Sequence, residues 1–331
     1  MATPSILITR RLPASVLARL EERCAIDLYT GAGAIPREEL LSRVRDKQAV
    51  VCLLTDRIDR DVIDAGAGLC VIANVAVGYD NVDVAYARSR GLVVTNTPDV
   101  LTESVAEFTW GLILAVTRRI AEGERLLRRG EWKGWALDFM LGSDLRGKQL
   151  GIVGMGRIGL AVAARAPAFG MRAAYVSADL IDRSLYAGSA PLPGLTPLSL
   201  DRLLASSDVV TLHVPLTPAT RHLIDQKALA RMKRSAYLVN TARGPVVDEA
   251  ALAWALREGL IAGAGLDVYA REPQVHPDLL ALENVVLVPH LGSATTETRT
   301  AMADLAATNV LEVLAGRLPV TPVTPPAASG T

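Results

Sequence analysis

Short apolar runs alternate with segments whose apolar residues recur at helical spacing along most of the chain. In the first hundred residues, strands are predicted at 6–9, 49–54 and 70–74, and helices at 13–24 and 59–65. Strands that alternate with helices in this way are typical of parallel sheets joined by crossover helices. The pattern therefore predicts an α/β fold for this part of the chain.

A second series of the same kind begins at Gln149. It predicts a helix at 248–258 and a set of strands at 149–153, 173–176, 209–213, 236–240, 262–267 and 285–288. Between the two series, residues 102–128 form the longest predicted helix, which begins at Thr102. At roughly 150 residues per domain, a chain of 331 residues is expected to form two domains, and both are predicted to be α/β.

Charge and cysteine content narrow the classes of partner. Lysine and arginine together number 35, as do aspartate and glutamate, so the formal net charge is zero and offers no general attraction to nucleic acid or anionic membranes. No apolar run reaches the roughly 18 residues of a membrane-spanning helix. The three cysteines, Cys24, Cys52 and Cys70, lie in apolar stretches, fit no zinc spacing and follow no secretory signal. We therefore predict a cytoplasmic protein with buried, reduced thiols that binds no nucleic acid, membrane or metal.

A glycine-rich motif joins the predicted strand 149–153 to a helical pattern. Gly154, Gly156 and Gly159 stand at the spacing G-x-G-x-x-G, with Arg157 and Ile158 between the last two. In this setting the first glycine permits a tight turn, the second lets the backbone approach a pyrophosphate, and the third allows the helix to pack closely on the strand. The helix N-terminus would offer N–H groups to the pyrophosphate. The motif predicts a dinucleotide site.

The end of the next strand bears on which nicotinamide cofactor is bound. An acidic side chain there would bind the adenosine ribose and repel a 2′-phosphate. In this chain the position is Ser177, which tolerates a phosphate, but the nearest arginine is Arg183, and Asp179 could bind the ribose instead. Both cofactors stay open: we expect NADP(H) to be modestly preferred and NAD(H) to be possible.

Three charged side chains follow the ends of three predicted strands in the second series. They are Arg243, Glu272 and His290. Because the carboxyl ends of parallel strands meet at one edge of a sheet, we expect these side chains to lie together. Carbonyl reduction needs a cation to hold a carboxylate and polarise the carbonyl, an acid to protonate its oxygen, and a carboxylate to support that acid. The set predicts such a reaction.

With these motifs, the chain resembles the D-isomer-specific 2-hydroxyacid dehydrogenase family, and most of all its glyoxylate/hydroxypyruvate reductases. The likeness extends to about residue 322, and the reductase likeness rests on residues 74–83, 130–135 and 262–268. It implies hydride transfer from NAD(P)H to a small 2-oxo acid, with Arg243 orienting the substrate, Glu272 as carboxylate partner and His290 as acid/base. A 2-ketogluconate reductase or another 2-oxo acid reductase of the family stays open. In a different class, so does a nucleotide-sensing protein like the corepressors that share this fold.

The resemblance also implies two sets of binding residues. For the substrate these are the backbone N–H groups of the Val77 and Gly78 loop, together with Leu53, Trp135 and Arg243. For the cofactor they are the glycine motif with Arg157 and Ile158, Ser177 or Asp179, and a further group: Thr102, His213, Val214, Pro215, Thr241, Ala242, Asp267 and Gly292.

The family's architecture gives the expected domain organisation. Two Rossmann-like domains are expected, each with a parallel sheet and flanking helices, and with the active site in the interdomain cleft. Residues 1–100 and 293–331 would form a discontinuous substrate-binding domain, and residues 101–292 the NAD(P)-binding domain. The resemblance further implies a homodimer, with the segment around 106–135 in its interface.

Overall fold

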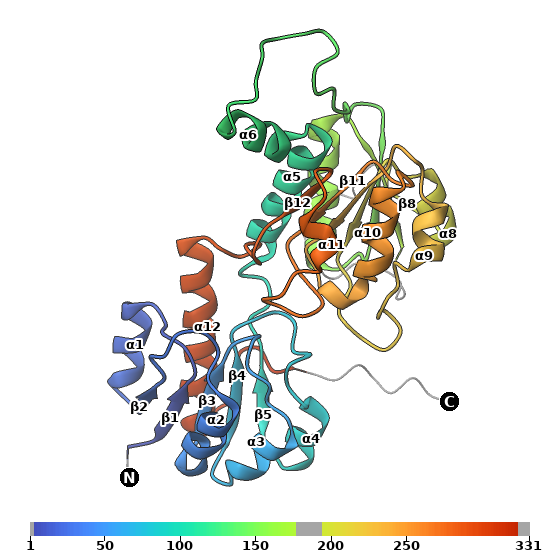
Figure 1. The fold of residues 1–331 in the computed structure, drawn as a ribbon. Coiled ribbons are helices and arrows are strands. Elements are labelled where there is room, and N and C mark those ends of the chain that lie inside the picture. The colour runs from blue at the N-terminus through green and yellow to red at the C-terminus, as the bar shows by residue number, and fades with distance from the viewer. Residues whose placement is uncertain (1–2, 177–193, 324–331) are drawn as a thin grey trace. The chain divides into compact units, whose positions relative to one another are not determined.

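The computed structural model describes residues 3–176 and 194–323. The chain divides into two compact units: unit 1 comprises Met1–Leu101 with Thr295–Thr331, and unit 2 comprises Thr102–Ala294. Each unit is built on a parallel sheet with helices on its faces (Figure 1). The predicted fold class is therefore confirmed.

The sheet of unit 1 has the strand order β2-β1-β3-β4-β5, and every pairing is parallel. Its strands are β1 (Ser5–Ile8), β2 (Ala25–Leu28), β3 (Ala49–Cys52), β4 (Val71–Asn74) and β5 (Val93–Thr95). Its helices are α1 (Ala14–Glu21), α2 (Arg37–Arg43), η1 (Val44–Asp46), α3 (Arg60–Ala65), α4 (Val84–Ser89) and α12 (Thr296–Leu314).

Helices cover both faces of this sheet. Leu7, Val50 and Ile72 point to one face and form a buried cluster with side chains of α2, α3 and α4. Successive side chains of a strand point to opposite faces, and on the other face α12 packs on β3 and β4 and against α1 (Figure 1). The inner strands β3 and β4 are buried on both sides, which explains why their sequences are continuous apolar runs rather than alternating ones, whereas the edge strand β2 is partly exposed and contains Asp27.

The sheet of unit 2 has the order β12-β11-β10-β9-β6-β7-β8, and it too is parallel throughout. Its strands are β6 (Gln149–Val153), β7 (Arg172–Val176), β8 (Thr196–Pro197), β9 (Val209–Leu212), β10 (Tyr237–Asn240), β11 (Gly263–Leu266) and β12 (Val285–Leu287). The chain order reverses between β6 and β9, which is where doubly wound sheets bind nucleotides.

Two apolar clusters join this sheet to its helices. On one face Leu238 packs with side chains of α8 (Leu200–Ser206), α9 (Gln226–Arg231), α10 (Glu249–Arg257) and α11 (Pro277–Leu280). On the other, Ile152 packs with side chains of α5 (Thr102–Thr117), α7 (Arg157–Arg165) and η2 (Ala166–Phe169). One further helical turn, η4 (Gly244–Val246), follows β10. Helices thus cover both faces of the sheet.

The single helix predicted over residues 102–128 is wrong, because the structure has two helices there. α5 ends at Thr117 and α6 (Ile120–Arg128) begins after Arg119, whose φ of 54° is left-handed. The Thr117 carbonyl accepts a hydrogen bond from the Ser143 N–H at 2.8 Å, so a distant segment closes the end of α5. The Arg119 guanidinium also pairs with Glu122 in α6. The longest helix of the described residues is instead α12.

The cysteine prediction is wrong in one detail. Cys24 and Cys52 are buried free thiols, as expected, but the free thiol of Cys70 is exposed because this residue precedes β4 at the surface of unit 1. Within the described residues, no helix is long and apolar enough to cross a membrane.

Candidate active site

The carboxyl ends of three adjacent strands bring the predicted catalytic side chains to one edge of the unit 2 sheet. Asn240 of β10 is in register with Leu266 of β11, which pairs with Leu287 of β12. Arg243 follows β10, Glu272 follows β11 and His290 follows β12. Parallel pairing therefore explains why residues far apart in the sequence leave the sheet on the same side.

Glu272 and His290 form a hydrogen-bonded pair. His290 Nδ1 lies 2.8 Å from Glu272 Oε2, and the two side chains are 27% and 26% exposed. Burial would raise the pKa of Glu272, but the hydrogen bond and charge of His290, the Tyr269 N–H and the charge of Arg243 together hold it below its ordinary value. An ionised carboxylate only accepts hydrogen bonds, so Nδ1 carries a proton. His290 Nε2, which no described residue contacts by a hydrogen bond, is therefore available for proton exchange.

A buried carboxylate fixes the loop that carries His290. Asp267 is 1% exposed, and its two oxygens accept the N–H groups of Leu291 at 2.5 Å and Gly292 at 2.8 Å. The Asp267 carbonyl also accepts the His290 N–H at 2.9 Å. These three bonds hold the His290 backbone in a left-handed conformation, with a φ of 54°, which few residues other than glycine adopt. Asp267 thus has a loop-holding task that its predicted role as a cofactor ligand did not include.

The turn that carries Arg243 is held by the side chain of Asn240. Asn240 Oδ1 accepts the Ala242 N–H, and Asn240 Nδ2 donates to the Arg243 carbonyl, both at 3.0 Å. Arg243 also donates from its guanidinium to the Ala242 carbonyl at 2.8 Å. Thr241 in the same turn lies 3.0 Å from Thr109 of α5, oxygen to oxygen. The sequence pattern did not single out Asn240 as the residue that holds this turn, because an asparagine at the end of a strand is common in turns of every kind.

The glycine motif has the local geometry that a pyrophosphate requires. Gly154 has a φ of 98°, and a Cβ there would lie 2.6 Å from the His213 carbonyl carbon. A Cβ on Gly159 would collide with the Gly154 carbonyl oxygen, whereas a Cβ on Gly156 would meet no atom within 4 Å. The space over Gly156, at the N-terminus of α7, is therefore open to a ligand, and a helix N-terminus favours a negatively charged group. These residues fit a dinucleotide.

Other predicted cofactor residues lie near the same edge of unit 2 or at its start. His213, Val214 and Pro215 follow β9 directly; His213 Nε2 lies 3.0 Å from Thr211 Oγ1, and burial lowers the pKa of His213, which keeps the ring neutral near pH 7. Thr102 begins α5, and the same first turn of that helix contacts the loop after β12, because the Ser104 hydroxyl donates to the Gly292 carbonyl at 3.1 Å. Ser177 and Asp179 lie outside the described residues.

The predicted substrate-loop residues lie in unit 1. Val77 and Gly78 form part of the turn after β4, and neither backbone N–H has a hydrogen-bond partner among the described residues. Leu53 follows β3, the neighbouring strand, and its N–H donates to the buried Asp56 carboxylate at 2.8 Å. Trp135, by contrast, belongs to unit 2, where it lies between α6 and β6 and is 80% exposed.

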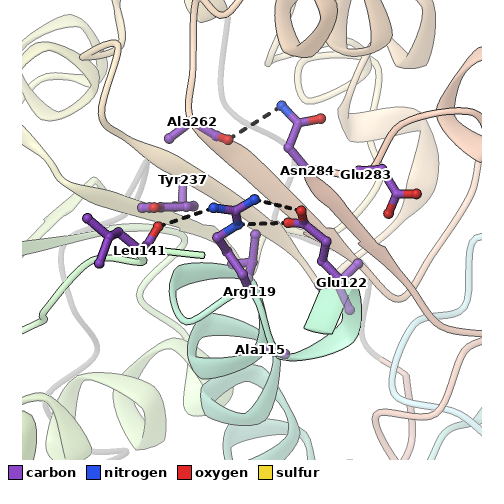
Figure 2. Close-up of a pocket in the computed structure, with 10 residues that line it drawn as sticks. Ala115, Arg119, Glu122, Leu141, Tyr237, Ala262, Glu283 and Asn284 are labelled. Atoms are coloured by element: carbon purple, nitrogen blue, oxygen red, sulfur yellow. Dashed lines mark hydrogen bonds and ion pairs between the residues drawn. The ribbon is translucent and has the colours of Figure 1, made fainter. Parts of the chain in front are cut away.

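A separate hollow of about 380 Å³ lies at the opposite edge of the unit 2 sheet. It is bordered by the amino ends of β10, β11 and β12, through Tyr237, Ala262 and Asn284, and by the α5–α6 corner (Figure 2). Figure 2 shows Arg119 pointing between Glu122 and the Leu141 carbonyl, so its charge is already paired. Because it lies at the other ends of the strands, this hollow is distinct from the edge that carries Arg243, Glu272 and His290.

Comparison with known proteins gives matches over nearly the whole chain. Residues 110–292 match the model of the D-isomer specific 2-hydroxyacid dehydrogenase, NAD binding domain. A glyoxylate reductase from Thermofilum pendens is 49% identical over 323 residues, which cover 96% of this chain and 94% of the relative. A Thermus thermophilus protein of known structure is 48% identical, with a TM-score of 0.89, and covers 97% of this chain and 100% of its own.

A further solved structure has a bound cofactor. It is an NADPH-dependent glyoxylate/hydroxypyruvate reductase from Sinorhizobium meliloti in complex with NADP and malonate, 37% identical, with a TM-score of 0.85 and coverage of 98% of this chain and 97% of that one. The matches confirm the resemblance that the motifs indicated.

Two alanine substitutions in the glycine motif should separate folding from nucleotide binding. Gly159→Ala forces a methyl group onto the Gly154 carbonyl and should lower stability by about 1–3 kcal/mol, the usual range for overpacking. Gly156→Ala should leave the melting temperature unchanged but weaken dinucleotide binding, because its methyl group enters the space left for the ligand. Thermal unfolding and a fluorescence titration with NADPH measure the two effects. Equal melting temperatures for Gly159→Ala and the wild type would contradict the packing argument.

Proposed function

Because the chain belongs to the D-isomer-specific 2-hydroxyacid dehydrogenase family, we propose that it is a glyoxylate/hydroxypyruvate reductase, which transfers a hydride from NAD(P)H to a small 2-oxo acid. The observation that carries this proposal is the His290–Glu272 pair, 2.8 Å apart, at strand ends next to the one that presents Arg243. The printed names of the relatives from Thermofilum pendens and Sinorhizobium meliloti support the choice of substrate.

Each catalytic side chain has a distinct task in this proposal. Arg243 binds the substrate carboxylate and polarises the adjacent carbonyl, and the N–H groups of Val77 and Gly78 bind the same carboxylate. When bound, the nicotinamide supplies the hydride that reaches the carbonyl carbon. His290 Nε2 gives its proton to the carbonyl oxygen, which becomes the hydroxyl group of the product. The Glu272 carboxylate stabilises the imidazolium before this transfer and holds the ring by Nδ1.

Replacing the acid should slow the reaction without unfolding the protein. His290→Ala is expected to lower kcat for glyoxylate by roughly 10²–10⁴, the usual contribution of a positioned general acid. His276 offers a matched control, because it only caps α11 by accepting the Asp278 N–H at 3.3 Å, so His276→Ala should retain the wild-type kcat. Steady-state kinetics with NADPH and NADH measure both variants. Near-wild-type turnover in His290→Ala would remove His290 from the mechanism.

The carboxylate partner should set the pH range of the reaction. Glu272 has a lowered pKa and is ionised near neutral pH, where its charge favours the protonated imidazole. In Glu272→Gln that negative charge, which stabilises the imidazolium, is absent. Since reduction needs the protonated ring, the rate–pH profile of glyoxylate reduction is expected to move to lower pH by about one to two units. An unmoved profile would mean that Glu272 does not support His290.

Activity measured on a panel of 2-oxo acids should show which reductase of the family this protein is. Glyoxylate, hydroxypyruvate and 2-ketogluconate should each be tested with both reduced cofactors under the same conditions. The proposal expects the two small acids to have the higher kcat/KM. A nucleotide-sensing protein would bind the cofactor but show little turnover of any of them.

We propose dual cofactor use with a modest preference for NADPH. The chain carries Ser177 directly after β7, where an acidic residue would repel the 2′-phosphate. No arginine follows at once to attract the phosphate, so a large preference is not expected. Ser177→Asp should depress kcat/KM for NADPH far more than for NADH. Equal effects on the two cofactors would point to Asp179 as the ribose ligand instead.

We further propose a homodimer that uses the exposed apolar surface of α6 and the segment after it. None of the residues of α6 is buried, and the surface gathers seven of the large exposed apolar side chains: Ile120, Leu127, Trp132, Trp135, Leu137, Phe139 and Leu141. Patches of this kind in a folded protein mark contact surfaces. We place the enzyme in the cytoplasm, where its free thiols stay reduced.

A charge placed on this surface should separate the two copies. Leu127 is 61% exposed. The substitution Leu127→Asp should yield a monomeric protein, because a desolvated carboxylate would face the partner. Leu318 in unit 1 is 90% exposed and lies outside the surface, so Leu318→Asp is the matched control and should not change the mass. Light scattering after gel filtration measures the mass. A monomeric wild type, or a Leu127→Asp variant that stays dimeric, would rule out this interface.

A further inference from the structure

The turn after β4 in unit 1 has two unpaired N–H groups, although much of the surrounding backbone is hydrogen-bonded. Val75 and Ala76 both donate their N–H groups, to the carbonyls of Cys52 and Asn74, each at 2.9 Å. Val77 and Gly78, which come next, have no N–H partner among the described residues. Successive backbone N–H groups directed to one place form an anion-binding nest. The directions of these two N–H groups are set by the conformation of two peptide groups.

Each of these two peptides is held by its carbonyl oxygen. The Ala76 carbonyl accepts the Thr97 N–H at 2.8 Å, and the Val77 carbonyl accepts Asn96 Nδ2, also at 2.8 Å. A trans peptide is planar, and its N–H points away from its C=O. The bond from Thr97 therefore directs the Val77 N–H, and the bond from Asn96 directs the Gly78 N–H. Of the two, only the second is made by a side chain.

The carbonyl of Gly78 is held as well, by a second asparagine. Asn74 Nδ2 donates to it at 2.9 Å, and this side chain is fully buried. Asn74 and Asn81 also bond to each other through their amide groups at 3.2 Å in both directions. Asn81 Nδ2 reaches the carbonyl of Leu53 at 3.0 Å as well. The far side of the turn is thus bound to the loop after β3.

Asn96 is itself anchored by the part of unit 1 that follows α12. Its carbonyl accepts the Thr321 hydroxyl at 2.7 Å, and its N–H donates to the Thr321 carbonyl at 3.3 Å. The fully buried Asn309 of α12 holds Thr321 by two bonds, of 2.7 and 3.0 Å. Asn96 therefore has little freedom to move, and it transmits that rigidity to the 77–78 peptide.

We propose that Asn96 is a positioning residue for substrate binding, which directs the Gly78 N–H toward the substrate carboxylate by holding the Val77 carbonyl. The inference rests on the proposed function, in which this N–H binds the carboxylate. A donor that is fixed before binding loses no conformational freedom and needs no reorganisation when the anion arrives. Without Asn96 the 77–78 peptide can rotate, and the N–H is no longer presented to the anion.

The prediction is a change in substrate affinity with little change in turnover. The carboxylate is not the reacting group, so Asn96 acts on the ground state and the transition state alike, and its loss should raise KM rather than lower kcat. In Asn96→Ala, KM for glyoxylate is expected to rise about tenfold, the effect of one weakened hydrogen bond to a charged group. KM for NADPH and NADH should stay within about twofold, and kcat should fall less than about threefold.

Asn96→Asp provides a second variant that keeps the shape of the side chain. Its ionised carboxylate cannot donate to the Val77 carbonyl, so KM for glyoxylate should rise at least as much as in Asn96→Ala. The rise should shrink as the pH is lowered, because the protonated carboxyl group can donate again. Such a recovery would tie the rise in KM to the hydrogen bond that the side chain donates to the Val77 carbonyl.

The matched control is Asn284→Ala. Asn284 also donates from its amide to two backbone carbonyls, those of Leu256 and Ala262. It lies in unit 2, at the edge of the sheet opposite to the one that carries Arg243, Glu272 and His290. Its replacement should leave KM for glyoxylate unchanged, whatever its effect on the melting temperature.

The outcomes separate this inference from the proposed function. If the wild-type protein does not reduce glyoxylate or hydroxypyruvate, the proposed function fails first. If it does, but both Asn96 variants keep KM for the substrate within about twofold of the wild-type value, the positioning role is overturned and the function stands. A fall in kcat at unchanged KM overturns the positioning role as well.

Discussion

Burial of the Asp267 carboxylate is the constraint on which the arrangement of unit 2 depends. A charged group removed from water is costly unless hydrogen bonds compensate it, and here two N–H groups from the loop after β12 do so. The loop after β12 must therefore pass close to the carboxyl end of β11, where Asp267 lies. His290 takes its unusual backbone conformation as a result, and Glu272, five residues after Asp267, comes within hydrogen-bond distance of its ring. His290 and Glu272 are thus held next to each other with the help of one buried carboxyl group.

The sequence allowed the broad architecture to be predicted, for physical reasons that are local. Strands buried on both faces are continuous apolar runs, and crossover helices repeat their apolar residues at their own period, so both signals lie in short windows. The positions of Arg243, Glu272 and His290 after three predicted strands were informative for the same reason, since parallel pairing brings all strand ends to one edge. The glycine motif can likewise be recognised from a short stretch of sequence, because its glycines meet requirements of the local backbone.

What could not be predicted depends on contacts between distant segments. The end of α5 at Thr117 is closed by Ser143, and no pattern within residues 102–128 indicates that partner. Cys70 lies in an apolar stretch, yet its side chain points to the surface, because one residue before a strand the alternation of faces is not yet fixed. Asn96 and Asn240 hold turns by amide side chains, and an asparagine near a strand end looks the same in sequence whether or not it does so.

The two-part composition of unit 1 has a consequence for the order in which the protein is made. The ribosome synthesises the chain from its amino end, so the five strands of unit 1 and then all of unit 2 emerge before α12 and Thr321 do. Until that last stretch arrives, Asn96 lacks the hydroxyl and carbonyl that anchor it, and β3 and β4 lack the helix that covers one of their faces. All of unit 2 is therefore synthesised before the segment that anchors Asn96 and completes unit 1.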